Sequence, residues 1–153
     1  MRMTTTLGTG LLLLVAGVTV WGQDAKKEAA NPLLGEYIMV SGKDNGEQVP
    51  EERIKGNVVR ITDDTITAVD RDEKEIYVAK YMLDTTHTPY RIMMTVAGGP
   101  RESKGDKAEG IVELKGDTLR MAYAYAGGDV PKDFKTIGKK QLEFTMTVKK
   151  KDD

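Results

Sequence analysis

The sequence has no cysteine in its 153 residues and a single histidine, His87. The lack of thiols excludes disulfides, cysteine-ligated zinc, iron–sulfur clusters and thiol catalysis. One imidazole is also too few for a histidine-rich metal site, and it leaves most general-base mechanisms without their usual group. We therefore expect neither a metal nor any other cofactor.

An excess of charge of one sign is also missing. Lys and Arg number 23 and Asp and Glu number 24, which gives a formal net charge of −1. A nucleic-acid-binding protein gains much of its affinity by releasing counterions from phosphates, and this requires a basic excess. The balanced charge therefore argues against nucleic acid as a partner.

The sequence also lacks an apolar run long enough to span a membrane comfortably. The mostly apolar run from Leu7 to Trp21 follows a short positive segment that contains Arg2. A spanning helix needs about 20 apolar residues, whereas this run suits the core of a signal peptide. We predict a signal peptide over residues 1–22, with an uncleaved membrane anchor as the alternative. Cleavage after Gly22 implies export to the periplasm or the extracellular space, with no stable membrane insertion afterwards.

The rest of the chain is predicted to form one domain, residues 32–151, after a polar, flexible spacer over residues 23–31. In this domain short β-favouring segments alternate with turn residues, and only Pro50–Lys55 suggests a helix, of one or two turns. Regularly spaced short strands predict a sandwich or a barrel. The expected strands are Glu36–Ser41, Asn57–Thr62, Thr65–Asp70, Glu75–Leu83, Tyr90–Val96, Glu109–Leu114, Thr118–Ala124 and Leu142–Lys149, with a short extra one at Glu47–Val49.

Two hairpins have a register that the sequence predicts. A two-residue turn at Gly116–Asp117, with Gly116 at a positive φ, pairs Glu113 with Arg120 on the solvent-exposed face. A second turn at Asp63–Asp64 gives a similar alternation. The resulting apolar pairs share the other face: Leu114 with Leu119, Val112 with Met121, Ile61 with Ile66 and Val59 with Ala68. One apolar and one wet face per strand predicts an antiparallel sheet closed around an apolar interior.

Several motifs together resemble a known family. They are Leu34–Gly42, Asn45–Pro50, the turn Leu114–Arg120, and Phe134 followed by Leu142–Lys150. Over Pro32 to Lys151 the chain resembles an uncharacterised family of small exported domains that is abundant in planctomycetes. That family is similar to the lipocalin-like barrels, whose first strand carries Gly-x-Trp where this chain has Gly35-Glu36-Tyr37. The resemblance implies an all-β, single antiparallel lipocalin-like barrel of about eight strands with one short helical turn, and an export route. It implies no catalytic residue.

No group of residues predicts an enzyme. His87 lies in a turn-rich connector without a second histidine, and neither Ser41 nor Ser103 lies in a Gly-x-Ser-x-Gly motif. The acids around Asp63 and Asp70 lack the spacing of a calcium loop, and aspartate is common in turns. We therefore expect a non-enzymatic protein.

The strands carry methionine and tyrosine on their apolar faces, which suits an adaptable binding cavity. The hypothesis is that a small apolar molecule binds in the barrel interior, with the Gly98–Lys107 loop as a lid. The candidate ligand-binding residues are Tyr37, Met94, Met121, Tyr123 and Phe144. An eight-stranded barrel can instead be filled by its own side chains. The alternative is therefore a packed envelope or protein-interaction module that meets an unidentified partner through surfaces such as Tyr123–Gly128.

Overall fold

The computed structural model describes residues 30–99, 104–125, 127–135 and 137–151. The predicted signal peptide over residues 1–22 and most of the predicted spacer lie outside the described residues. Residues 31–153 form one compact unit. In the described part of the chain, no helix combines the length and the apolar character needed to cross a membrane.

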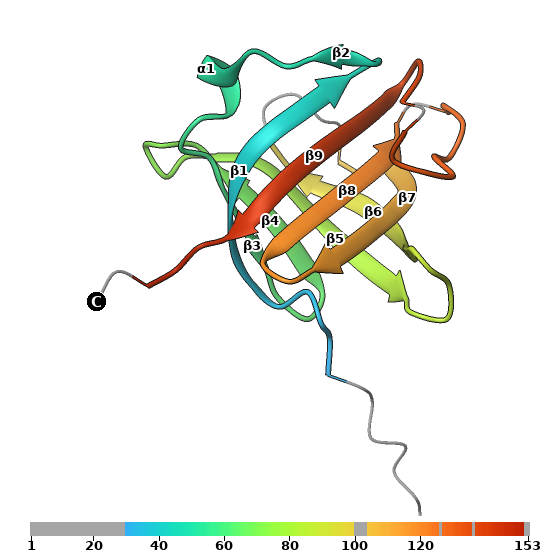
Figure 1. The fold of residues 1–153 in the computed structure, drawn as a ribbon, viewed down its shortest axis with the longest axis horizontal. Coiled ribbons are helices and arrows are strands. Elements are labelled where there is room, and N and C mark those ends of the chain that lie inside the picture. The colour runs from blue at the N-terminus through green and yellow to red at the C-terminus, as the bar shows by residue number, and fades with distance from the viewer. Residues whose placement is uncertain (1–29, 100–103, 126, 136, 152–153) are drawn as a thin grey trace, which may run out of the picture. The chain divides into compact units, whose positions relative to one another are not determined.

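This unit is a closed antiparallel β-barrel of eight strands with one additional short strand, β2 (Figure 1). The sheet order is β1-β3-β4-β5-β6-β7-β8-β9, and pairing between β1 and β9 closes it. The described residues contain one short helix, α1 (Glu51–Ile54), which follows β2. The strands are β1 (Gly35–Asp44), β2 (Glu47–Gln48), β3 (Val58–Ile61), β4 (Thr65–Val69), β5 (Glu75–Asp84), β6 (Tyr90–Gly98), β7 (Lys107–Lys115), β8 (Thr118–Ala124) and β9 (Gln141–Val148).

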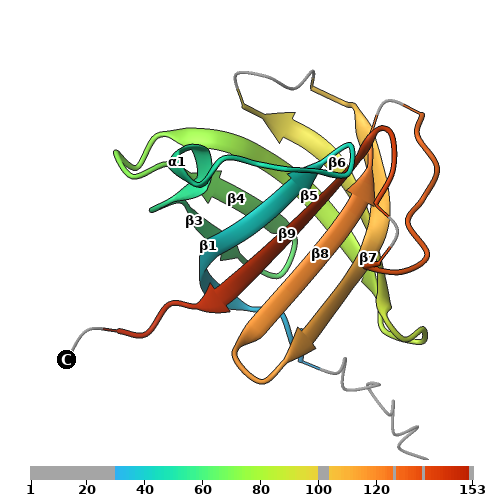
Figure 2. The ribbon, with the colours of Figure 1, turned by 45° about the horizontal axis from the view of Figure 1, so that its top comes forward.

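The predicted elements are confirmed, and the main difference is the length of β1. This strand was expected to end at Ser41, but it continues to Asp44 alongside β9. The pairing register shifts between Met39 and Ser41, and such a bulge bends a strand, which lets it follow the curve of a barrel. The longer strand carries Asp44 to the end of the barrel where α1 and β2 lie (Figures 1 and 2).

Both predicted hairpin registers are confirmed. Glu113 pairs with Arg120, and the apolar pairs of β7 and β8 form as expected. Gly116 has a φ of 57°, a conformation that glycine adopts without the strain of a side chain. The pairs of β3 and β4 around the other turn also match. Turn chemistry and alternation therefore set the local register in both hairpins.

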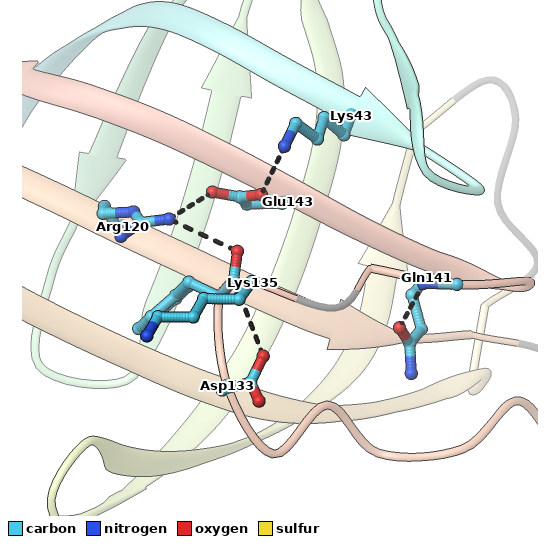
Figure 3. A network of polar contacts seen from close by, with 8 residues as sticks. Lys43, Arg120, Asp133, Lys135, Gln141 and Glu143 are labelled. Carbon is cyan, nitrogen blue, oxygen red and sulfur yellow. Dashed lines mark hydrogen bonds and ion pairs between the residues drawn. The ribbon is translucent and has the colours of Figure 1, made fainter.

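Arg120 lies on the outer face of the sheet as predicted, but that face is partly covered there, and the side chain is 37% exposed. Phe134, from the connection between β8 and β9, is buried with Ile111 and Ala122 on the outer face of the sheet. The Arg120 guanidinium carbon lies 4.5 Å from the Phe134 ring centroid, and Nη2 donates to Glu143 Oε1 at 2.8 Å (Figure 3). The sequence did not predict that Phe134 covers Arg120, because Phe134 lies in a connection without a strand pattern.

Glu143 itself is almost fully buried on that outer face. Its side chain is only 7% exposed, and its second oxygen lies 3.9 Å from Lys43 Nζ on β1. Gln141, two residues earlier, donates to the Asp129 carbonyl at 2.6 Å and accepts from the Gly138 amide at 2.7 Å. This polar network, seen in Figure 3, attaches the β8–β9 connection to the outside of the barrel.

Candidate ligand cavity

The barrel has a closed end, at which the chain enters β1. Leu33 is completely buried there, and Tyr37 is 2% exposed. The Tyr37 hydroxyl donates to the Leu33 carbonyl at 2.9 Å, and the Tyr81 hydroxyl donates to the Thr62 carbonyl at 2.5 Å. Asn31 in turn donates to the Tyr81 hydroxyl. Burial raises the pKa of Tyr37 and of Tyr81 above the ordinary value of 10.0. These side chains fill this end of the interior.

At the opposite end, near α1, lies a cavity of about 660 Å³. Its inner wall is apolar and comes from strands all around the barrel. The inner wall includes Met39, Met94, Met121, Met146, Leu142 and Phe144. Methionine side chains are flexible and polarisable, so this wall can adapt to apolar molecules of different shapes. The volume and lining are typical of a small-molecule site.

Four of the five predicted ligand-binding residues line this cavity. Met94, Met121 and Tyr123 are 2%, 4% and 8% exposed, and Phe144 is half-buried. Tyr37 faces the interior as expected, but it lies at the closed end and does not line the cavity. Alternation along a strand gives the face of a residue but not its height in the barrel, and the height separates Tyr37 from the others.

Two glycines, which sequence reasoning did not single out, allow close approaches to residues of the cavity wall. A Cβ at Gly42 would lie 2.8 Å from the Phe144 ring, and a Cβ at Gly110 would lie 2.7 Å from the Tyr123 Cβ and 1.9 Å from the Ala122 carbonyl oxygen. A glycine within a strand often marks a close approach of this kind, so the sequence carried a usable signal.

One side of the cavity rim combines a carboxylate with aromatic residues. Asp44 ends β1 and pairs with Leu142 of the inner wall. Its Oδ1 accepts hydrogen bonds from Asn45 Nδ2 at 2.7 Å and from the Tyr125 hydroxyl at 3.3 Å. Asp44 and Tyr125 are 81 residues apart in the chain. This cluster was not predicted, because its members meet only after the barrel closes.

The other side of the rim consists of α1 and the turn between β4 and β5. Arg71 Nη2 donates to the Glu52 carbonyl at 3.3 Å, which links the turn to the helix. Asp70 shapes the turn, because its Oδ1 accepts from the amides of Asp72 and Lys74, each at 2.9 Å. The predicted turn role of Asp70 is therefore confirmed. Arg53 also contributes to this side of the rim.

The described residues of the predicted lid lie at the open end of the barrel but outside the cavity lining. Of the Gly98–Lys107 loop, residues 100–103 lie outside the described residues, and none of the described ones lines the cavity. The helix α1 and the Asp70–Lys74 turn border the opening instead.

His87 lies away from this cavity and is exposed in its turn. Its Nδ1 is 3.0 Å from Asp84 Oδ2 and 3.1 Å from the Thr86 hydroxyl. Hydrogen bonds from the hydroxyl and the amide of Thr86 lower the pKa of Asp84. Within the described ranges, no group of three or more His, Asp or Glu side chains is placed to bind a metal ion.

The described chain is thus a closed antiparallel barrel with an apolar cavity at one end. Compared with protein-family models, with curated proteins and with solved structures, the chain gives no match.

Proposed function

We propose that this protein is an exported, non-enzymatic barrel that binds a small apolar molecule in its interior, as lipocalin-like carriers do. The observation that carries the proposal is the 660 Å³ cavity with its methionine-rich wall. It exceeds the roughly 300 Å³ at which small-molecule sites begin. A fully packed barrel of eight strands would have no such space.

The proposal implies modest affinity. Burying about 200 Å² of apolar ligand surface contributes roughly 5 kcal/mol before the cost of association is subtracted. The expected dissociation constants are therefore micromolar to millimolar. A carrier or sensor that releases its ligand works in this range.

The binding test is a screen of fatty acids, isoprenoids and hydrophobic dyes by thermal shift and dye fluorescence. Ala68→Phe, on the inner face of β4, should occupy part of the cavity and weaken the response. Thr67→Phe adds the same ring to the outer face of the same strand and should leave the response unchanged. If none of these molecules binds the folded protein, the proposal is wrong.

Export is proposed from residues 1–22 alone and needs its own test. Intact-mass measurement on protein recovered from outside the cytoplasm should show a chain that begins at Gln23. Because Trp21 is the only tryptophan, the cleaved protein should also show tyrosine fluorescence only. A recovered mass that retains Met1 to Gly22 would contradict cleavage.

The alternative, a protein-interaction module, is favoured by one observation. Met82 and Met93 pair across β5 and β6 on the outside of the barrel, and they are 64% and 45% exposed. Exposed methionines are typical of adaptable protein contacts. Replacing both with Ser should leave ligand binding unchanged, whereas loss of a protein partner in that variant would favour the alternative.

A further inference from the structure

The charged groups around the cavity indicate which polar head its ligand carries. The wall below the rim is apolar, so the head of an amphiphilic ligand must lie at the rim, where water and charged side chains are available. Four carboxylates and two guanidinium groups line this rim: Asp44, Glu52, Asp70, Asp72, Arg53 and Arg71. The two sides of the rim differ in which charges they combine: Asp44 lies on one side, and the two arginines and the other three acids lie on the other.

On the β1 side, the carboxylate of Asp44 is oriented but not neutralised. The Asn45 amide and the Tyr125 hydroxyl both donate to its Oδ1. None of the ion pairs formed by the described residues uses Asp44. A half-buried carboxylate beside an apolar wall attracts a cation more strongly than one in open water, because screening is weaker there.

Aromatic rings border the cavity next to this carboxylate. Tyr123 and Phe144 have ring centroids 6.5 Å apart, with planes tilted by 39°. Both line the cavity, together with Tyr125, whose hydroxyl contacts Asp44. The faces of aromatic rings attract cations, and ammonium groups are often bound where several rings converge. A carboxylate on a cavity that is also lined by aromatic side chains therefore favours an organic cation.

The opposite side of the rim offers little net positive charge to an anion. Arg71 already donates to the Glu52 carbonyl. Arg53 and Arg71 are accompanied there by the carboxylates of Glu52, Asp70 and Asp72. An anionic head would meet these acids as well as the arginines, so like-charge repulsion would offset the attraction.

We propose that the cavity selects amphiphilic organic cations, with an apolar body against the methionines and an ammonium group between Asp44 and the Tyr123 and Tyr125 rings. The inference rests on the proposed binding of an apolar molecule in the barrel. It adds the charge and the position of the polar head.

The test compares three probes with the same ten-carbon chain: decyltrimethylammonium, decanol and decanoate. Calorimetry below their aggregation concentrations should show decyltrimethylammonium binding about tenfold more tightly than decanol, which is the gain expected of a partly desolvated cation beside aromatic rings. Decanoate should bind more weakly than decanol. This comparison uses the unmodified protein and does not depend on the folding of a variant.

Two variants then locate the polar head of the bound ligand. Asp44→Asn should reduce the affinity for decyltrimethylammonium to that of decanol and leave decanol within about twofold. Asp72→Asn removes an acid from the opposite side of the rim and should change neither value by more than about twofold. Thermal unfolding of both variants should match the unmodified protein.

Two results would overturn the inference while leaving the proposed function intact: equal binding of all three probes, or tighter binding of decanoate than of decanol. A retained cation preference in Asp44→Asn would also overturn the assignment of Asp44. Absence of binding by every probe would instead remove the proposed function, and the inference with it.

Discussion

The two ends of this barrel are built from the same strands, yet one is filled and the other is hollow. At the closed end, Leu33 and Tyr37 occupy the interior, and the Tyr37 hydroxyl is satisfied by a backbone carbonyl. At the open end, the Phe144 ring lies over Gly42, and Tyr123 lines the cavity. Aromatic side chains therefore fill one end and line the other.

Strand number alone therefore does not decide whether a barrel has a cavity. The closed end is filled because the segment before β1 places Leu33 inside and Tyr37 points toward it. At the open end, Gly42 lets the Phe144 ring lie close to the wall, and a cavity remains inside the barrel. The predictions below test this contrast.

The largest effect is expected at the closed end. Tyr37→Ala should lower the free energy of unfolding by about 3–5 kcal/mol, because it leaves an unfilled space and an unpaired Leu33 carbonyl. Phe144→Ala at the open end should cost only about 1–2 kcal/mol, because its half-buried ring already borders a cavity. Urea unfolding measures both. Equal costs would contradict the contrast between the two ends.

A smaller loss of stability is expected for the polar network of Arg120, Glu143 and Lys43 on the outside of the barrel. Arg120→Ala should cost about 2 kcal/mol, because it leaves the buried Glu143 carboxylate with only the more distant Lys43. Lys115→Ala removes an exposed ion pair with Glu113 and should cost less than about 0.5 kcal/mol. A double variant with Glu143→Gln should recover part of the loss. If Arg120→Ala and Lys115→Ala lower the free energy of unfolding by the same amount, the network does not stabilise the barrel.

The turn at the closed end gives a test of backbone strain alone. A side chain at Gly116 would meet nothing within 4 Å, so its φ of 57° is the only obstacle. Gly116→Val should therefore cost about 1 kcal/mol or slightly more in thermal unfolding. Gly105 has a φ of 90° in a turn at the open end, and a side chain there would also meet nothing within 4 Å. Gly105→Val is therefore the matched variant at that end. A silent Gly116→Val would contradict the turn geometry.

The smallest effect concerns charges outside the closed end. The hydrogen bond from Arg60 Nε to Glu36 at 2.8 Å lowers the pKa of Glu36 below 4.5. A carboxylate whose pKa is lower in the folded state stabilises the fold above the unfolded pKa, and this contribution is lost as the pH falls through the folded pKa. Because the side chain is 42% exposed, the gain should be only about 0.5 kcal/mol.

Glu36→Gln should therefore be less stable than the unmodified protein at pH 7 and equally stable near pH 2. The pH dependence of the denaturant midpoint measures this difference. Glu47→Gln is the matched control, because Glu47 is exposed on β2 and forms no ion pair with the described residues. A stability gap that persists at pH 2 would show that the carboxylate charge is not its source.

Most of the barrel was predictable because its local rules agree with one another. Alternation identified the inner faces of the strands, and the Gly116–Asp117 turn set a register that the structure confirms. The same alternation placed Met94 and Met121 at the cavity. Alternation could not exclude Tyr37 from the cavity lining. The position of a side chain along the barrel axis depends on the stagger between strands, and some of these strands pair only when the sheet closes.

By itself, the sequence determined the strands, their inward faces and the two tight hairpins, since each depends on residues within one or two adjacent segments. Only the tertiary structure decided which end of the barrel is open. It also covered Arg120 with Phe134 and brought Tyr125 to Asp44 across 81 residues. These contacts depend on the pairing of β1 with β9, the closure that joins the two ends of the sheet. Local propensity does not specify the register of that pairing, because no single segment contains both partners.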